Sequence, residues 1–441
     1  MKIYSINPLN ALFRQQLANN NKFCNNQEVS NNDLIIIYPS NYYLTSSVAF
    51  GAKNVELIAQ MEKAIRSNKF DEVSKLFEQM TVAAQKNVKG LVEKFKVEDL
   101  TLKDYLSACV KRPQLFYLAP ETIEKNVKGL VEKFKVDGLT IKDYLPACVK
   151  QPQLFYQSPE TLEKNVREFV EKFKSEGLTI KDYLPACVKL PQLFYQFPET
   201  LEKNVREFVE KFISEGLTIK DYLSACVKLP QLFSLAPETI EKILRGLVEK
   251  FKSEGLTIKD YLPACVKQPQ LFYQSPETIE KNVREFVEKF KSEGLTLKDY
   301  LPACVKQQPL FCQKPDTIAQ HIDIIRFSKY NMGQQIDNAF FWKQLFKQPM
   351  QLGFSNSLLL TRDLIIPKMF EGHEIPKGLK GNRLKQKLND YLLANPDKKF
   401  VLNLKKMNSQ TDCVKVLADY LEKLTTELKL KKNTFTINII E

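Results

Sequence analysis

Residues 152–190 read PQLFYQSPETLEKNVREFVEKFKSEGLTIKDYLPACVKL. Residues 269–307 repeat this stretch with three changes: Leu162 becomes Ile279, Ile180 becomes Leu297, and Leu190 becomes Gln307. The tetrapeptide Pro-Gln-Leu-Phe starts at positions 113, 152, 191, 230 and 269, so the unit recurs every 39 residues. A period of this length is typical of a solenoid, in which each unit buries its apolar face only against its neighbours.

Each unit is predicted to contain a long helix, called the first helix below. In the quoted copy, Ser158 is suited to the N-cap and Pro159 to the first helical position. Gly177 predicts the point at which the chain leaves this helix. One face carries apolar residues at helical spacing, namely Leu162, Val166, Phe169, Val170 and Phe173.

A shorter second helix is predicted from Thr179, because Asp182 lies three residues later, close to the pattern of a capping box. Pro185 is expected to bend this helix or restrict it to short turns, since proline removes one backbone hydrogen bond. Residues 191–194 then predict a short 3₁₀-like turn. The inward residues are predicted to be Ile180, Tyr183, Leu184, Cys187 and Val188. The fold class is therefore mainly α, a right- or left-handed α-solenoid of 39-residue helical repeats.

The Pro-x-Leu-Phe turn, the first helix with its apolar stripe, the Gly-Leu-Thr link and the second helix together resemble a known repeat. It is the repeat of the mitochondrial transcription termination factor (mTERF) family. The resemblance covers about residues 74–316, and a degenerate unit extends it to about residue 354. It implies triple-helix units that coil into a superhelix, and such superhelices commonly bind nucleic acid.

Three regions are expected along the chain. Residues 1–54 are predicted to be an N-terminal segment that is partly disordered, with a candidate strand at 34–38. Residues 55–354 are predicted to form the repeats, with degenerate units that cap both ends. Residues 355–441 lose the 39-residue period and are predicted to form a small basic α/β appendage.

Within this C-terminal region, apolar runs at 400–404 and 434–440 predict two strands. The sequence at 412–428 predicts a helix between them, so the order indicates a small βαβ unit. A further helix is predicted near 382–393.

Six of the nine cysteines occupy one repeat position: Cys109, Cys148, Cys187, Cys226, Cys265 and Cys304. Helices of neighbouring repeats lie about 8–10 Å apart, whereas a disulfide needs Cα atoms within about 7 Å. We therefore expect small buried hydrophobic residues in a reducing compartment. A ladder of metal-bound thiolates is the alternative, but there is no Cys-x-x-Cys, and both histidines lie outside the repeats.

No catalytic residue, metal site, cofactor or small-molecule substrate is predicted. The sequence has neither a Gly-x-x-x-x-Gly-Lys phosphate loop nor a His-Glu-x-x-His motif. No apolar run reaches the roughly 18 residues of a membrane span, and the first residues lack the apolar stretch of a secretory signal. We expect a non-enzymatic, cytoplasmic protein, while secretion without a classical signal stays open.

The net charge of +13 is unevenly distributed, since residues 85–318 carry +4 and residues 319–441 carry +8. One lysine near the end of each second helix has no acidic residue within four positions. These lysines are Lys111, Lys150, Lys189, Lys228, Lys267 and Lys306. In a solenoid they would form a column that tracks phosphates; the alternative is that each only compensates the negative end of its helix. Arg112 joins them as a candidate nucleic-acid contact.

The residue directly before each turn varies in the order Arg112, Gln151, Leu190, Leu229, Gln268 and Gln307. Polar residues that vary at one repeat position are typical of modular base recognition. Leu190 and Leu229, together with Phe197, instead predict a ridge that contacts a protein partner. Four tyrosines beside the turns are candidates either for stacking on bases or for packing between repeats: Tyr117, Tyr156, Tyr195 and Tyr273.

A basic cluster in the C-terminal region is a candidate grip on acidic partners, or else a solvated surface. It comprises Lys377, Lys380, Arg383, Lys385 and Lys387.

These observations predict a scaffold that binds a macromolecular partner without catalysis. A protein partner is preferred, because the unit 152–190 has no net charge and its variable positions include apolar residues. Nucleic acid is the alternative, implied by the resemblance to the mTERF repeat. An enzyme with its site in residues 356–441 is a more distant alternative.

Overall fold

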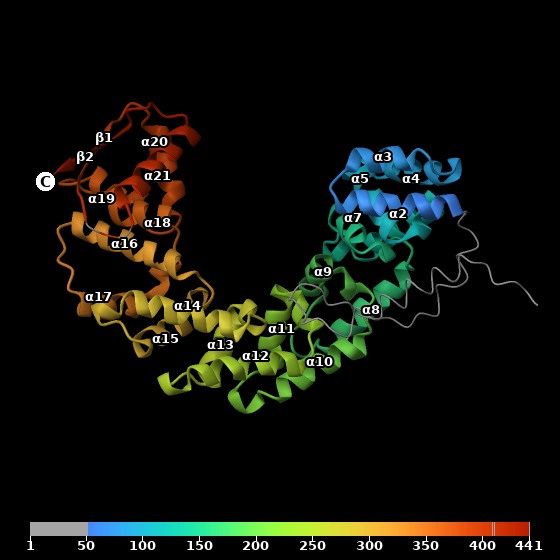
Figure 1. Ribbon diagram of the computed structural model, residues 1–441, viewed down its shortest axis with the longest axis horizontal. Coiled ribbons are helices and arrows are strands. Elements are labelled where there is room, and N and C mark those ends of the chain that lie inside the picture. The colour runs from blue at the N-terminus through green and yellow to red at the C-terminus, as the bar shows by residue number, and fades with distance from the viewer. Residues whose placement is uncertain (1–51, 408, 410, 441) are drawn as a thin grey trace, which may run out of the picture. The chain divides into compact units, whose positions relative to one another are not determined.

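The structure is a computed structural model that describes residues 52–407, 409 and 411–440 (Figure 1). The strand predicted at 34–38 lies outside the described residues. The chain divides into two compact units, Met1–Thr81 and Val82–Glu441. In the first unit, α2 (Ala52–Arg66) and α3 (Phe70–Phe77) pack on each other. The region boundaries predicted near residues 54 and 354 stay a prediction.

The first helices form where the sequence predicts them. Proline occupies the first helical position from α6 onward, and in α8 the Ser158 Oγ accepts a hydrogen bond from Thr161 N at 3.4 Å. The predicted apolar stripe of α8 is buried, with Phe169 at 1% and Phe173 at 0% exposure. The first helices are α4 (Val82–Lys94), α6 (Pro120–Lys133), α8 (Pro159–Lys172), α10 (Pro198–Glu210), α12 (Pro237–Lys250), α14 (Pro276–Lys289) and α16 (Pro315–Asn331).

The second helices begin at the predicted capping boxes. In α9, Thr179 N donates to Asp182 Oδ2 at 3.2 Å, and Asp182 N donates to Thr179 Oγ1 at 3.3 Å. These two bonds satisfy backbone donors that a helix start leaves unpaired. The second helices are α5 (Leu102–Lys111), α7 (Ile141–Lys150), α9 (Ile180–Lys189), α11 (Ile219–Lys228), α13 (Ile258–Lys267), α15 (Leu297–Lys306) and α17 (Asn338–Lys347).

Two details of the second helix differ from the prediction. Helix α9 continues through Pro185 over ten residues, the same length as α5, which has Ser107 at this position. One missing backbone bond is therefore tolerated without a break in the helix. Ile180 and Val188 are only half-buried, whereas Tyr183 and Cys187 are fully buried, so the inward face is narrower than predicted.

A 3₁₀ turn follows each second helix. In the turn at Pro191–Phe194, Leu193 N donates to Leu190 O at 3.0 Å, which is the bond between residues three apart that defines this geometry. The corresponding turns are Pro113–Phe116, Pro152–Phe155, Pro230–Phe233, Pro269–Phe272, Gln308–Phe311 and Pro349–Gly353. The first helix α8 ends at Lys172, earlier than predicted, and Gly177 ends the turns that follow it, with a φ of +89° that glycine adopts without strain.

Successive helix pairs pack in order, first helix on first helix and second helix on second helix (Figure 1). An aromatic cluster joins neighbouring repeats: Phe233 lies with its ring centroid 5.4 Å from that of Phe169 and 5.5 Å from that of Tyr183. A polar contact repeats beside it, because Asn165 Nδ2 donates to Phe194 O at 3.3 Å. Asn87, Asn126 and Asn204 make the equivalent bond.

The repeating arrangement continues one helix beyond residue 354. Helix α18 (Asn356–Leu360) packs on α16 as α16 packs on α14. A π-helical turn at Thr361–Ile365 connects α18 to α19 (Ile366–Met369). Pro367 lies in this segment, and a π turn is one way in which a helix accommodates an interruption of its hydrogen bonds.

The C-terminal region confirms the predicted βαβ unit. Strands β1 (Phe400–Lys405) and β2 (Phe435–Ile440) pair in parallel, with Phe400 opposite Phe435, and α21 (Cys413–Glu427) connects them. The predicted neighbouring helix is α20 (Leu384–Ala394). Buried polar residues of α16 tie this region to the repeats, as Asp323 Oδ2 accepts a bond from Thr411 N at 3.0 Å. Among the described helices, none has the length and apolar character needed to cross a bilayer.

Candidate nucleic-acid interface

The six lysines Lys111, Lys150, Lys189, Lys228, Lys267 and Lys306 each end a second helix and are exposed. We call them the lysine column. Because first and second helices run in opposite directions, the lysines lie at the edge where the turns lie and the following first helices begin. This edge is called the turn edge below. Within the described residues, none of the six lysines forms an ion pair.

Several basic residues of the first helices, by contrast, form ion pairs with the next repeat. Lys133 Nζ lies 2.7 Å from Glu163 Oε2 of the next repeat, and both side chains are mostly shielded, at 28% and 23% exposure. The hydrogen bond from Lys133 is the main reason that the pKa of Glu163 lies below its ordinary value. The same bond raises the pKa of Lys133. Both shifts favour the charged forms, so the pair stays ionised.

Arginine completes this arrangement four residues further along the helix. Arg167 Nε lies 2.8 Å from Glu163 Oε1, and its guanidinium lies 5.1 Å from the ring centroid of Phe134 in the preceding repeat. The same ion pairs between repeats occur at Lys94–Glu124, Lys172–Glu202, Lys211–Glu241 and Lys250–Glu280. The acids of the first helices thus have partners of their own and do not neutralise the lysine column.

The charge of a repeat is therefore divided between its two helices. Residues 159–177 carry four basic and five acidic residues, whereas residues 180–189 carry two lysines and one aspartate. The carboxylate of that aspartate, Asp182, is bonded to Thr179 at the start of α9. A repeat without net charge consequently presents a net positive second helix and a net negative first helix. A sum of charge over a whole repeat conceals this distribution.

The ridge predicted to contact a protein lies at the same turn edge. Leu190 and Leu229 are half-buried and directly follow Lys189 and Lys228. Phe197 is the N-cap residue of α10 and is 72% exposed. The residues predicted for the two kinds of partner therefore belong to one surface. Arg112 lies at this edge too, half-buried at the end of α5.

The four tyrosines near the turns differ in their surroundings. Tyr273 is 48% exposed, while Tyr117, Tyr156 and Tyr195 are half-buried. Gln151 Nε2 donates to the Tyr195 hydroxyl at 2.7 Å across 44 residues, so this tyrosine takes part in packing between repeats. Stacking on bases stays a prediction for all four.

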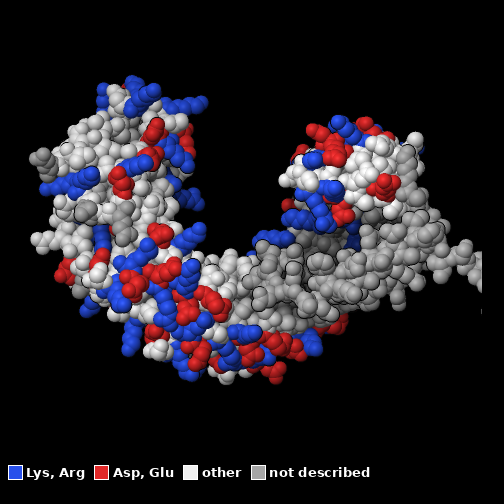
Figure 2. All heavy atoms as spheres, viewed as in Figure 1, with Lys and Arg blue, Asp and Glu red and all other residues white. Residues whose placement is uncertain are grey.

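The C-terminal basic cluster is assembled around the start of α20. In Figure 2, Lys and Arg gather over the part of the C-terminal region that contains α20, whereas positive and negative residues are interspersed over the repeats in view. Lys380 lies 3.7 Å from Glu374, and Lys387 Nζ donates to Lys380 O at 2.6 Å. Lys377, Arg383 and Lys385 are exposed, and Lys385 Nζ donates to Ser357 Oγ at 3.0 Å.

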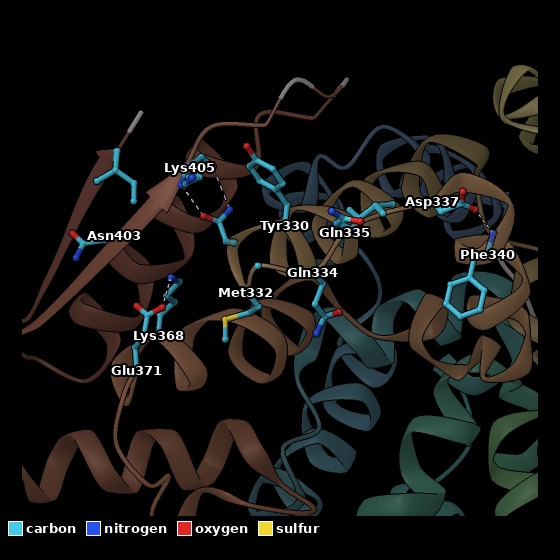
Figure 3. Close-up of a pocket in the computed structure, with 14 residues that line it drawn as sticks. Tyr330, Met332, Gln334, Gln335, Asp337, Phe340, Lys368, Glu371, Asn403 and Lys405 are labelled. Atoms are coloured by element: carbon cyan, nitrogen blue, oxygen red, sulfur yellow. Dashed lines mark hydrogen bonds and ion pairs between the residues drawn. The ribbon is translucent and has the colours of Figure 1, made fainter.

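A cavity of about 1150 Å³ lies where the end of α16 and the start of α17 face α19 and β1 (Figure 3). On one side Asn331 binds the end of β1, since Lys405 N donates to Asn331 Oδ1 at 2.6 Å. On another side Lys368 Nζ lies 2.8 Å from Glu371 Oε1. The residues that line the cavity include neither cysteine nor histidine, so it does not assemble a cysteine–histidine nucleophile.

The model of the mTERF family matches residues 125–299. Among curated proteins, none matches this chain. The matched span contains four members of the lysine column, Lys150, Lys189, Lys228 and Lys267, together with the helices that carry them. Residues 125–299 of the α-solenoid are therefore similar to the helical repeats of the mTERF family.

Proposed function

We propose that this protein binds nucleic acid through the lysine column of its mTERF-type repeats and acts as a non-catalytic regulatory binder. The observation that carries the proposal is that, among the residues the structure describes, six exposed lysines at one edge have no ion-pair partner. Cations that repeat along a surface bind phosphates by releasing condensed counterions, and this contributes most of non-specific nucleic-acid affinity.

From the sequence alone, a protein partner is preferred because the repeats are nearly neutral. That reason loses its weight once the charge is assigned to individual helices. The ion pairs of Glu163 and its equivalents lie within the first-helix layer, while the second helices keep a net positive charge. The family match also favours nucleic acid. A protein partner stays the second candidate because Phe197, at 72% exposure, is a large apolar residue at the turn edge.

The test compares two quadruple variants with the same change in charge. The first replaces Lys150, Lys189, Lys228 and Lys267 by Gln. The matched control replaces the lysines at the opposite ends of the same four helices, Lys142, Lys181, Lys220 and Lys259, by Gln. Binding of labelled duplex and single-stranded probes is measured over a salt series.

We expect the first variant to bind more weakly and to reduce the slope of log affinity against log salt by about 0.7–0.9 for each lost phosphate contact. The control variant should change the slope much less. Equal losses in both variants would show that only total charge matters and would refute the assignment to the turn edge. Failure of the unaltered protein to bind either probe at physiological salt would overturn the proposal. Loss of a protein partner on changing Phe197 to Ser would then support the second candidate.

A further inference from the structure

The turn edge contains a second repeating feature, which differs from one repeat to the next. In three places a side chain near one turn bonds to the residue that follows the next turn, and we call such a group of positions a seam. A seam comprises the residue directly before a turn, the residue six positions later, and the residue 44 positions later, which follows the next turn in every seam except the last. In one seam these positions are Gln151, Gln157 and Tyr195.

Hydrogen bonds show that the members of a seam come together across repeats. Gln151 Nε2 donates to the Tyr195 hydroxyl at 2.7 Å. In the next seam, Ser234 Oγ donates to Gln196 Oε1 at 3.1 Å. Two seams later, Cys312 Sγ donates to Gln274 Oε1 at 2.8 Å. The other seams follow from the 39-residue equivalence of their positions.

The seams vary while their surroundings stay constant. Read in chain order, the three positions hold Arg-Leu-Tyr, Gln-Gln-Tyr, Leu-Gln-Ser, Leu-Leu-Tyr, Gln-Gln-Cys and Gln-Gln-Gln, so no two of the six are alike. The lysine that precedes each seam is the same in every copy. Phosphate contacts position a nucleic acid without reading its sequence, and variable side chains beside them are what sequence recognition requires.

The side chains of the seams are accessible and chemically suited to this task. Nearly all are half-buried, and Tyr273 is exposed. An amide side chain offers both a donor and an acceptor, which is the pattern that pairs with the edge of a base. Within the described structure, the Oε1 atoms of Gln157 and Gln313 are buried and have no hydrogen-bond partner, so each amide would have to turn toward the surface before it could accept a bond from a base.

The spacing of the repeats relates the number of bases read by each seam to the form of nucleic acid. Packed helices of neighbouring repeats lie about 8–10 Å apart, whereas a strand in a duplex advances about 3.4 Å per base. Along a duplex, the distance between two seams would therefore correspond to about three base pairs. One base for each seam requires an extended strand with unstacked bases, as in helical repeats that read RNA with two or three side chains for each base.

We propose that the seams determine sequence specificity, each reading one base of a single-stranded nucleic acid whose phosphates lie on the lysine column. This inference rests on the proposed function and adds the form of the ligand and the residues that distinguish one sequence from another. The Leu-Leu-Tyr seam, Leu229, Leu235 and Tyr273, has no amide and discriminates least between bases by hydrogen bonding.

The experiment exchanges one seam for another that already occurs in the protein. The triple variant Gln268→Leu, Gln274→Leu, Cys312→Tyr converts the fifth seam into a copy of the fourth. The reverse variant, Leu229→Gln, Leu235→Gln, Tyr273→Cys, converts the fourth into a copy of the fifth. Each full-length protein is incubated with a randomised 12-nucleotide single-stranded RNA pool, a matching DNA pool and a duplex pool. The bound fractions are sequenced, and thermal melting checks that both variants fold.

We expect the triple variant to change the base preference at one position of the bound strand by about tenfold, in line with the usual cost of one mismatched contact. The reverse variant should change the neighbouring position instead. Affinity for the whole pool and its salt slope should stay within about twofold of the unaltered protein, since the lysines are untouched. The control Lys267→Gln should weaken all sequences alike.

The outcomes separate this inference from the proposed function. Pools that bind with unchanged base preferences in both exchanged variants would overturn the inference and leave the proposed function intact. A preference found only in the duplex pool would overturn the assignment to a single strand. If no pool binds the unaltered protein, the proposed function and the inference both fail.

Discussion

The buried thiols illustrate how one residue position serves every repeat. Cys148 and Cys187 are 0% exposed, and burial raises the pKa of each thiol above its ordinary value. Burial also keeps reagents away from the sulfur, and the reactive thiolate becomes scarcer at any given pH. Within the described residues, His, Cys, Asp and Glu do not gather into a group of three that could hold a metal. The thiols therefore act as small apolar side chains in the core.

This environment predicts their reactivity. In the folded protein at pH 8, iodoacetamide should leave Cys109, Cys148, Cys187, Cys226, Cys265 and Cys304 unmodified, while the half-buried Cys312 reacts slowly. Unfolding in guanidinium should expose all of them, so peptide mass spectrometry before and after unfolding makes the comparison. Rapid labelling of the six in the folded state would contradict the burial described above.

At the residue scale, the sequence predicted most of what depends on local pattern. The capping box at Thr179 and the stripe through Phe169 depend on spacing alone, and the structure confirms them. The helix stop predicted at Gly177 falls instead at Lys172, with Gly177 ending the turns that follow. The half-exposure of Ile180 and Val188 depends on how far the neighbouring repeat covers a helix, and local spacing contains no such information. The seam partners could not be predicted for the same reason. The only signal in the sequence is that polar residues such as Gln196 and Ser234 lie about one repeat period apart.

At the scale of the helices, the first helices fall into two kinds. Gly129 and Gly246 occupy a position where other copies have glutamate, such as Glu168. A Cβ at Gly129 would lie 3.0 Å from Cγ of Pro159 in the next repeat, whereas a Cβ at Gly246 would lie 3.4 Å from Cγ of Pro276. The glycines therefore permit a close approach between neighbouring first helices, and Gly129 permits the closer one.

This difference in available space predicts different effects of the same substitution at the two glycines. Alanine is favoured over glycine inside a helix by about 1 kcal/mol. Gly246→Ala should gain most of that amount, because 3.4 Å is an ordinary contact. Gly129→Ala should gain less or destabilise the protein, because Pro159 must move. Chemical denaturation of the two variants and the unaltered protein gives the comparison, and an equal or larger gain at Gly129 would show that the contact is not tight.

The elements themselves were predicted well where a period supports them, and less well elsewhere. The second helix, its turn and the βαβ order all follow from sequence patterns. The prediction that Pro185 would bend the second helix or restrict it to short turns did not anticipate a continuous ten-residue helix. Helix α18 has the packing of a first helix without the sequence of one, so only its contact with α16 identifies it.

At the scale of the whole chain, net charges summed over the sequence were the least informative quantity. The net charge of +13 and the neutral repeat both hid a separation of charge between the two helix layers. The separation arises because Lys133 and Arg167 form ion pairs with Glu163, whereas Lys150 and Lys189 have no acidic residue within four positions in the sequence. Candidate lysines could thus be named from the sequence, but their freedom from ion pairs could be seen only after the repeats were assembled.

Contacts between adjacent repeats also determine how far the destabilisation caused by a core substitution extends along the chain. Phe169 is 1% exposed, and its ring centroid lies 4.6 Å from that of Tyr183 and 5.4 Å from that of Phe233. Phe169→Ala should cost about 3–5 kcal/mol of local stability, since it removes a large buried side chain and leaves a cavity. In a solenoid each repeat contacts mainly its neighbours, so amide protection should fall most in α8–α11.

The matched control is Leu421→Ala in α21, which is 4% exposed and belongs to the C-terminal region. It should loosen α21 and the strands beside it while leaving the protection of α8–α11 nearly unchanged. Hydrogen exchange followed by mass spectrometry reports both regions in one experiment. If Phe169→Ala raised exchange equally in α8 and α21, the chain would unfold as one cooperative unit, and the contacts between repeats would reach further than one neighbour. Local loosening would instead leave distant seams and lysines in place, which is the condition for exchanging a single seam without disturbing the others.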